Sequence, residues 1–246
     1  MSAIDPLTGK TVWAQPTGGW QDRGGVLTTD SGLLVHGTIA GQLIVRDAKT
    51  GRLLKSIETG SSILAAPMTY RVKGVQYVAV MAAWGGGGFP YVPRTAAAYS
   101  RENNGRLLVF KLGGGAVPLP PVLPPLEVAP EAPAHATGVT PATIAEGRGL
   151  FFENCAICHS NQHRSITPDL RRMSRGTHQS FNDILLKGLL VQGGMPRWDD
   201  VLSSAQADAI HAYLVDQQSS TRRDELAKKR AGKPLDAPSL AILSNY

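Results

Sequence analysis

The sequence predicts a multidomain protein, in which a β-stranded N-terminal region is followed by a proline-rich linker and a small all-helical domain. Three observations predict this order. Short apolar runs bounded by turn residues fill residues 1–112, seven prolines fall within residues 113–138, and apolar residues recur at helical spacing across residues 139–218. The remaining residues, 219–246, are polar and charged, and we expect a peripheral helix and tail there.

The composition excludes some classes of protein. The chain has 246 residues, of which 42% are hydrophobic, so two small cores can form without disulfide bonds. Its longest apolar run, residues 75–84, is about half of the ~20 residues that a membrane helix needs, so no membrane span is expected. The net charge is +6, but the basic residues are not interleaved with stacking aromatic residues, so nucleic acid is not an expected partner.

The N-terminal region is predicted to be a partial all-β propeller. Its expected strands are residues 33–37, 42–47, 53–57, 75–82 and 106–112. The turn DPLTG at residues 5–9 recurs as DAKTG at residues 47–51, a spacing within the ~40 to 45 residues of a four-stranded blade. Residues 1–112 suffice for two to three blades, and an unclosed ring exposes strand edges and blade faces. We therefore expect the remaining blades on a partner or in a longer parent chain.

The helical domain begins with clear start signals. Thr140 is suited to cap a helix and Pro141 to its first position, and the helical spacing continues to Cys155. A second helix is expected at residues 181–190, and a third begins after Ser203 or Ser204. An all-helical domain of this size is therefore expected after the linker.

Both cysteines of the chain lie in CAICH, residues 155–159, for which we weighed three interpretations. A redox disulfide of this spacing normally sits at a strand-to-helix junction, whereas this one follows a predicted helix. A structural zinc site would need further ligands, for which His163, His178 and His211 are the candidates. Covalent haem uses every residue of the motif: Cys155 and Cys158 bind the two vinyl groups, and His159 is the proximal iron ligand.

A haem site also needs a second axial ligand. Met195, within QGGMPRW, is the preferred candidate, since glycines let its loop approach a porphyrin and Pro196 fixes the chain beyond it. Met173 is the rival, although its charged neighbours suit it less. With these ligands the order of elements resembles class I c-type cytochromes, in which the first and last helices cross. The resemblance implies that Gly147 and Phe151 pack against the helix carrying Ile210, Tyr213 and Leu214. It also implies that the carbonyl of Pro168 accepts the proximal imidazole proton, which would raise the basicity of the ligand.

The whole chain resembles the C-terminal part of the PQQ-dependent quinohaemoprotein alcohol dehydrogenases. The resemblance is carried by the segments DPLTGKTVW (5–13), GGVLTTDSGLLVHGTIAGQLIVRDAKTGRLL (24–54), APMTYRVKGVQYVAVMAAWGGGG (66–88), NNGRLLVFKLGGG (103–115), CAICH, PDLR and GGMP. It implies that Trp13 is a blade-docking tryptophan, whereas the second copy of the repeat has Lys55 where a tryptophan might stand. It also implies that Trp84 and its glycines line the quinone end of the propeller.

The activity implied by this family is alcohol oxidation at PQQ, assisted by a calcium ion and an aspartate base, with single electrons passing through haem to an external cytochrome, cupredoxin or quinone. The base and the calcium ligands have no match in this chain, so no catalytic residue is assigned, and PQQ and calcium are expected only where the missing blades are supplied. The chain is expected to be an electron-transfer module that is not catalytic alone. The alternative is a propeller-based binding module with zinc at CAICH. Since c-type haem attachment follows export, a periplasmic location is expected, although no signal peptide is visible in residues 1–10.

Overall fold

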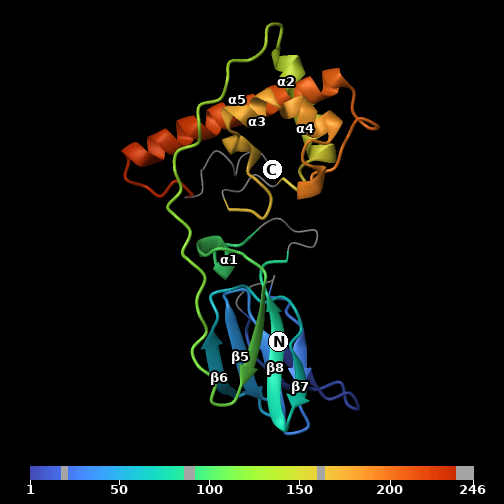
Figure 1. Ribbon diagram of the computed structural model, residues 1–246, viewed down its shortest axis with the longest axis vertical. Helices are drawn as coiled ribbons and strands as arrows, with labels where there is room; N and C mark the ends of the chain where they lie inside the picture. Colours follow the sequence, from blue (N-terminus) through green and yellow to red (C-terminus); the bar gives the residue numbers. More distant parts are fainter. Residues whose placement is uncertain (18–21, 86–91, 160–163, 237–246) are drawn as a thin grey trace. The chain divides into compact units, whose positions relative to one another are not determined.

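The computed structural model describes residues 1–17, 22–85, 92–159 and 164–236, which divide into two compact units, with Pro124 assigned to the first and Pro125 to the second (Figure 1). The first unit is built from antiparallel sheets and the second from helices. His163 and the glycines at 86–88 lie outside the described residues. Among the helices that the structure describes, none is both long enough and apolar enough to cross a membrane.

Three antiparallel sheets make up the first unit (Figure 1). A hairpin comes first, followed by a four-stranded meander and then a three-stranded sheet. The elements are β1 (Ser2–Ile4) and β2 (Thr11–Ala14); β3 (Val26–Thr28), β4 (Leu33–Gly37), β5 (Gln42–Asp47) and β6 (Leu53–Glu58); and β7 (Met68–Val72), β8 (Val75–Ala82) and β9 (Arg106–Lys111), with the short helix α1 (Ala97–Ser100) before β9. The meander has the order of a propeller blade, so the expected partial propeller is confirmed.

The five expected strands are confirmed as β4, β5, β6, β8 and β9, but β1, β2, β3 and β7 were not predicted. The missed strands have physical reasons. β1, β2 and β3 have only three or four residues, and all five residues of β7 are exposed. Such segments carry too little alternation of apolar and polar residues to predict a strand, and they are defined by pairing with a neighbour.

The core of the first unit lies between the meander and the three-stranded sheet. Val35 and Leu43 of the meander meet Val80 and Ala82 of β8, with the fully buried Ile63 beside them. A side chain at Gly37 would meet Ile63, because a β-carbon there would lie 2.0 Å from its Cγ2 atom. The pleat places these apolar residues on one face of each sheet, which is why alternation identified β4 and β5.

The three-stranded sheet also carries an apolar face that is exposed to solvent. Paired residues on this face include Met81 with Leu107 and Met68 with Ala79, and Val109 pairs with the same alanine from the other side. Met81, Leu107, Met68 and Val109 are between 47% and 59% exposed. An isolated soluble sheet rarely presents so continuous an apolar row, which is typical of a face that packs against another layer.

The second unit is a helical domain whose first and last helices pack together (Figure 1). Its elements are α2 (Pro141–Asn154), the 3-10 turn η1 (Leu170–Arg172), α3 (Arg175–Gln179), α4 (Phe181–Lys187), the 3-10 turn η2 (Val191–Gly193) and α5 (Ser204–Arg230). Thr140 and Ser203 form capping boxes at the starts of α2 and α5, which confirms both start signals. Phe151 meets Tyr213 with ring centroids 5.4 Å apart, as the cytochrome resemblance implied.

The proline-rich segment, predicted as a semi-rigid spacer, has residues that are hydrogen-bonded within each unit. Its first part bonds to the first unit, where Arg106 donates to the Pro118 carbonyl at 2.7 Å and Arg101 donates to the Pro120 carbonyl at 2.8 Å. Residues 127–130, which we call the strap, bond to the second unit, on the part of α5 beyond residue 217. Residues 219–230 therefore continue α5 and carry contacts of their own.

Candidate functional site

The CAICH motif forms a single turn at the end of α2. Cys155 is the C-terminal cap of this helix and its N–H donates to the Phe151 carbonyl. The N–H groups of Cys158 and His159 both donate to the Cys155 carbonyl, at 3.1 and 2.9 Å. Both thiols and the imidazole are thus carried by one short rigid turn, so their spacing is fixed by the local backbone.

The two cysteines are free thiols in different surroundings. Cys155 is buried and Cys158 is exposed. Burial, with a smaller contribution from the neighbouring Cys158, raises the pKa of the Cys155 thiol to about 11. Cys155 is therefore fully protonated at neutral pH, which suits neither a redox dithiol with an activated thiolate nor rapid chemistry at this sulfur.

The imidazole ring of His159 is held in one orientation by a hydrogen bond to the Pro168 carbonyl. Its Nδ1 lies 3.1 Å from the Pro168 carbonyl oxygen, and since a carbonyl only accepts, Nδ1 carries the proton. Nε2 is then left with its lone pair, which is the arrangement that a metal-binding histidine needs. The Thr167 hydroxyl donates to the Cys158 carbonyl, which ties the segment before Pro168 to the motif.

The loop with the proposed distal ligand lies between α4 and α5. Gly194 has φ 92° and ends η2, and the Met195 N–H donates to the Leu190 carbonyl at 3.2 Å. Met195 is half-buried and packs against the core of the unit. Met173 is 5% exposed inside that core, and both its N–H and its carbonyl bond to the Gln218 side chain. Met173 is thus engaged in core packing, whereas Met195 lies on the loop between α4 and α5.

The surroundings of the motif fit a haem group. Large apolar side chains of the second unit are exposed on the CAICH turn, on the following loop and on the loop before Met195, namely Ile157, Ile166, Leu189, Leu190 and Val191. A domain of this size does not normally leave so many large apolar side chains exposed to water. A flat apolar ring system covalently held at CAICH would cover such residues.

The zinc interpretation finds less support in the described residues. Nδ1 of His178 lies 2.9 Å from Nε2 of His211, so these two histidines bond each other. Within residues 1–17, 22–85, 92–159 and 164–236 there is no cluster of three or more His, Cys, Asp or Glu side chains that could hold a metal ion. His163 lies outside those ranges.

Trp84, expected at a cofactor site, is a core residue of the first unit. It is 4% exposed and packs with Ile39, Val92 and Ala96. Its backbone N–H and carbonyl are bonded to the Asn103 side chain at 2.7 and 3.1 Å. This burial gives Trp84 a packing role, and its assignment to a quinone site stays a prediction.

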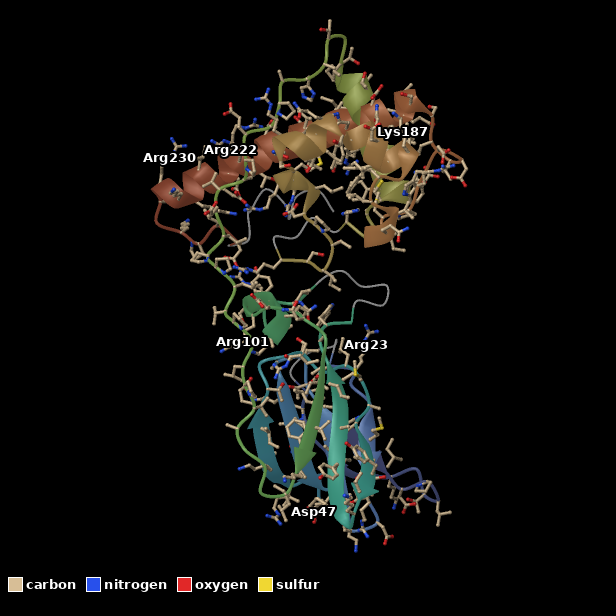
Figure 2. All side chains as sticks on the ribbon, viewed as in Figure 1. Arg23, Asp47, Arg101, Lys187, Arg222 and Arg230 are labelled. Carbon is tan, nitrogen blue, oxygen red and sulfur yellow. The ribbon has the colours of Figure 1, made fainter. Side chains whose placement is uncertain are left out.

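The two repeated turns have the same structure. Asp5 Oδ1 accepts the N–H groups of residues 7 and 8, and Asp47 Oδ1 accepts those of residues 49 and 50. The pKa of Asp5 is lowered chiefly by the Leu7 N–H, and the pKa of Asp47 chiefly by the Thr50 hydroxyl, which donates to Oδ1 at 2.9 Å, so both are ionised turn residues. Trp13 from the first copy packs on Gly51 of the second, and its Nε1 donates to the Ala48 carbonyl at 3.0 Å. Asp47, labelled in Figure 2, is the last residue of β5 and begins the turn to β6.

Sequence reasoning missed the buried polar groups of α5. Gln218 and Glu225 are both fully buried, and Glu225 pairs with Arg172. The available signal was periodicity, because both residues extend the helical stripe of Ala207, Ile210 and Leu214. Because both residues are polar, the residues beyond 218 were predicted to be exposed to solvent.

Comparisons with known proteins agree with this architecture. Residues 1–78 match a family model described as the glucose/ethanol/alcohol dehydrogenase β-propeller domain, and residues 142–214 match one described as cytochrome c oxidase, cbb3-type, subunit III. Quinohemoprotein alcohol dehydrogenase ADH IIB of Pseudomonas putida is 35% identical over 93% of this chain and 33% of its own length. The 1-butanol dehydrogenase (cytochrome c) of Thauera butanivorans is 30% identical over 89% of this chain and 31% of its own.

Solved structures give the same relationship. The structure of quinohemoprotein alcohol dehydrogenase ADHIIG from Pseudomonas putida HK5 aligns with a TM-score of 0.77 at 32% identity, covering 93% of this chain and 33% of that one. That of the Comamonas testosteroni quinohemoprotein alcohol dehydrogenase aligns with a TM-score of 0.66 at 27% identity, covering 89% and 31%. The chain thus spans about a third of the length of the relatives it matches.

Proposed function

We propose that this chain, which matches about a third of the length of quinohaemoprotein alcohol dehydrogenases in sequence and fold, is the C-terminal, electron-transfer portion of such an enzyme. In this proposal its second unit carries covalent c-type haem and relays single electrons from a reduced quinone to an external acceptor. A cytochrome, a cupredoxin or a quinone can serve as that acceptor.

One observation carries the proposal. His159 has its Nδ1 proton bonded to the Pro168 carbonyl and its Nε2 lone pair available, on the same turn as two free cysteines. Cys155 and Cys158 would hold the haem through thioether bonds, and His159 and Met195 would be its axial ligands. Bound haem supplies a one-electron ferric/ferrous couple, whose potential is raised by methionine ligation and by burial.

The residues of the chain prepare for such a group. The CAICH turn fixes the imidazole. Residues 193 and 194 are glycines, so no β-carbon there would keep the Met195 loop away from the haem. The exposed apolar side chains of these segments would exclude water from the bound group. A haem with low exposure to water needs little rearrangement of solvent when the charge of its iron changes. Such a haem is suited to electron transfer.

Alcohol oxidation itself would occur in the remaining two-thirds of a full-length enzyme. PQQ and calcium would bind there, and the exposed apolar face of the three-stranded sheet would pack against a further blade. The proposal assigns no catalytic base to this chain, because Asp5 and Asp47 are satisfied by their own turns. The location would be the periplasm, where c-type haem is attached in bacteria.

The test is covalent haem content. The chain is exported with a supplied signal peptide in a host that matures c-type cytochromes, extracted with acid and acetone, and examined as its alkaline pyridine haemochrome. Haem that stays with the polypeptide and shows the spectrum of two thioether bonds supports the proposal. Cys155→Ala with Cys158→Ala is the control that should release all haem. Extractable haem in the unsubstituted chain, or zinc without iron by elemental analysis, would overturn it.

A further inference from the structure

We infer that buried Glu225 is a positioning residue for the proximal histidine, acting through Arg172 and the strap on the segment whose Pro168 carbonyl bonds His159. This inference rests on the proposed haem function. It assigns a role in tuning the haem iron to a proline-rich segment and to the last turns of α5, neither of which belongs to the CAICH motif.

Glu225 is the centre of a buried polar cluster. Its side chain is fully buried, with Oε2 accepting the Ala129 N–H at 2.7 Å and Oε1 accepting Arg172 Nη2 at 2.5 Å. The other face of the strap is held as well, since Arg222, labelled in Figure 2, donates to the Ala129 carbonyl at 2.6 Å. A buried carboxylate is costly unless it is paired and hydrogen-bonded, and here each of its oxygens has a partner.

Arg172 connects this cluster to the segment behind the motif. Its second terminal nitrogen, Nη1, donates to the Glu127 carbonyl at 2.7 Å, so one guanidinium group bonds both the strap and Glu225. Arg172 is also the last residue of η1, four residues after Pro168. The orientation of η1 is thus fixed by the bonds of Arg172 to the strap and to Glu225.

The short stretch between Pro168 and Arg172 is rigid. The Asp169 carboxylate accepts the Arg171 N–H at 3.0 Å and both Nε and Nη2 of the same arginine at 2.8 Å. The side chains of Asp169 and Arg171 are 4% and 7% exposed. A two-point arginine–carboxylate pair that is buried in this way has little freedom, so a displacement of Arg172 is passed on to the Pro168 carbonyl.

The consequence concerns the His159 hydrogen bond. A carbonyl that accepts the imidazole Nδ1 proton makes the ring a stronger donor to a metal, which favours the ferric state. Loosening Arg172 should weaken the 3.1 Å contact between His159 Nδ1 and the Pro168 oxygen. The expected effect is a higher midpoint potential and a faster exchange of the Nδ1 proton with solvent.

The experiment uses the full haem-loaded chain with Glu225→Gln, which keeps the shape of the side chain and removes its charge. The matched control is Asp224→Asn, which removes the same charge one residue away, where the side chain is 39% exposed and paired with Lys228. Two quantities are measured: the midpoint potential by spectroelectrochemical titration, and the exchange rate of the His159 Nδ1 proton by NMR in the ferrous state.

We expect Glu225→Gln to raise the potential and to speed Nδ1 proton exchange several-fold, and Asp224→Asn to leave the exchange rate unchanged. An unchanged exchange rate in Glu225→Gln with covalent haem present would overturn the inference. If Glu225→Gln does not fold, Arg172→Lys replaces it, because lysine keeps the charge but cannot bond Glu225 and Glu127 in the same fork; the same two readouts then decide. Absence of covalent haem from the unsubstituted chain would instead defeat the proposed function.

Discussion

The α-carbon of Gly147 faces the carbonyl group of Ala209 so closely that a β-carbon at residue 147 would lie 1.9 Å from that oxygen. This contact is where α2 packs against α5. Since CAICH continues directly from α2, the contact also sets where the cysteines and His159 lie relative to the core formed with α5.

Gly147→Ala should destabilise the second unit, because the new methyl group would meet the Ala209 backbone carbonyl, which cannot rotate away. The expected loss in the free energy of unfolding is about 1 to 3 kcal/mol from overpacking, although alanine gains ~1 kcal/mol in helix propensity. Gly149→Ala is the control, since that glycine lies in the same helix with nothing within 4 Å. Denaturant unfolding should show a loss for the first variant and a small gain for the second; equal effects would contradict the close contact.

A pair of glycines tests the docking of Trp13. Gly51 and Gly9 occupy the same place in the two repeated turns, with φ of 71° and 67°. Alanine at either costs about 1 to 2 kcal/mol for the left-handed backbone, but only at Gly51 would its β-carbon also lie 2.7 Å from the Trp13 ring. The unfolding midpoint of the first unit should therefore fall further for Gly51→Ala than for Gly9→Ala. Identical midpoints would show that Trp13 does not dock there in solution.

Met195→Ala should lower the midpoint potential of the haem-loaded chain and open the iron to carbon monoxide, because a thioether ligand stabilises the ferrous state. The control is Met173→Leu, which alters a methionine that is 5% exposed and packed in the core. This second variant should keep the potential and exclude carbon monoxide. Carbon monoxide binding by Met173→Leu alone would reverse the assignment of the distal ligand.

The His178–His211 pair predicts acid sensitivity. Burial lowers the pKa of both histidines, to about 4 for His211, whose pKa is lowered further by His178 and His135 and raised by Asp208. Gln218 Oε1 accepts from His178 Nε2, so His178 Nδ1 accepts from His211 Nε2 and the His178 ring is neutral. The folded pKa values lie below the unfolded value of about 6.5, so stability is complete above pH 6.5 and is lost as the pH falls toward 4.

The measurement is the free energy of unfolding of the second unit against pH. Its slope between pH 6.5 and 4 should be at most about 1.4 kcal/mol per pH unit for each histidine, and less if water reaches the partly exposed His211. His211→Phe should flatten this slope while lowering stability near pH 7, because the variant leaves the His178 Nδ1 lone pair unpaired. A wild-type slope that persists in the variant would locate the titrating groups elsewhere.

Local chemistry explains which parts of the fold and site were predictable from sequence. The turn residues Asp5 and Asp47 bond their own neighbours, the caps Thr140 and Ser203 bond the N–H groups three residues on, and the CAICH spacing is that of a single turn. Each of these features depends on residues within a few positions of one another. The turn, cap and motif residues are therefore determined by the sequence alone.

The tertiary structure decided the features that depend on distant partners. The short strands β1, β2 and β3 exist only because a neighbouring strand bonds them, and Trp84 is a core residue because Ile39, Val92 and Ala96 surround it. Glu225 lies in a charged stretch that the sequence predicts to be a peripheral tail, yet it is fully buried. It is paired with the Arg172 guanidinium and accepts the Ala129 N–H, and both partners are more than fifty residues away in the chain. The sequence determined the repeated turns, the helix caps and the CAICH motif, whereas only the fold decided which polar residues are buried behind that motif, since burial of a charge depends on partners that no local pattern records.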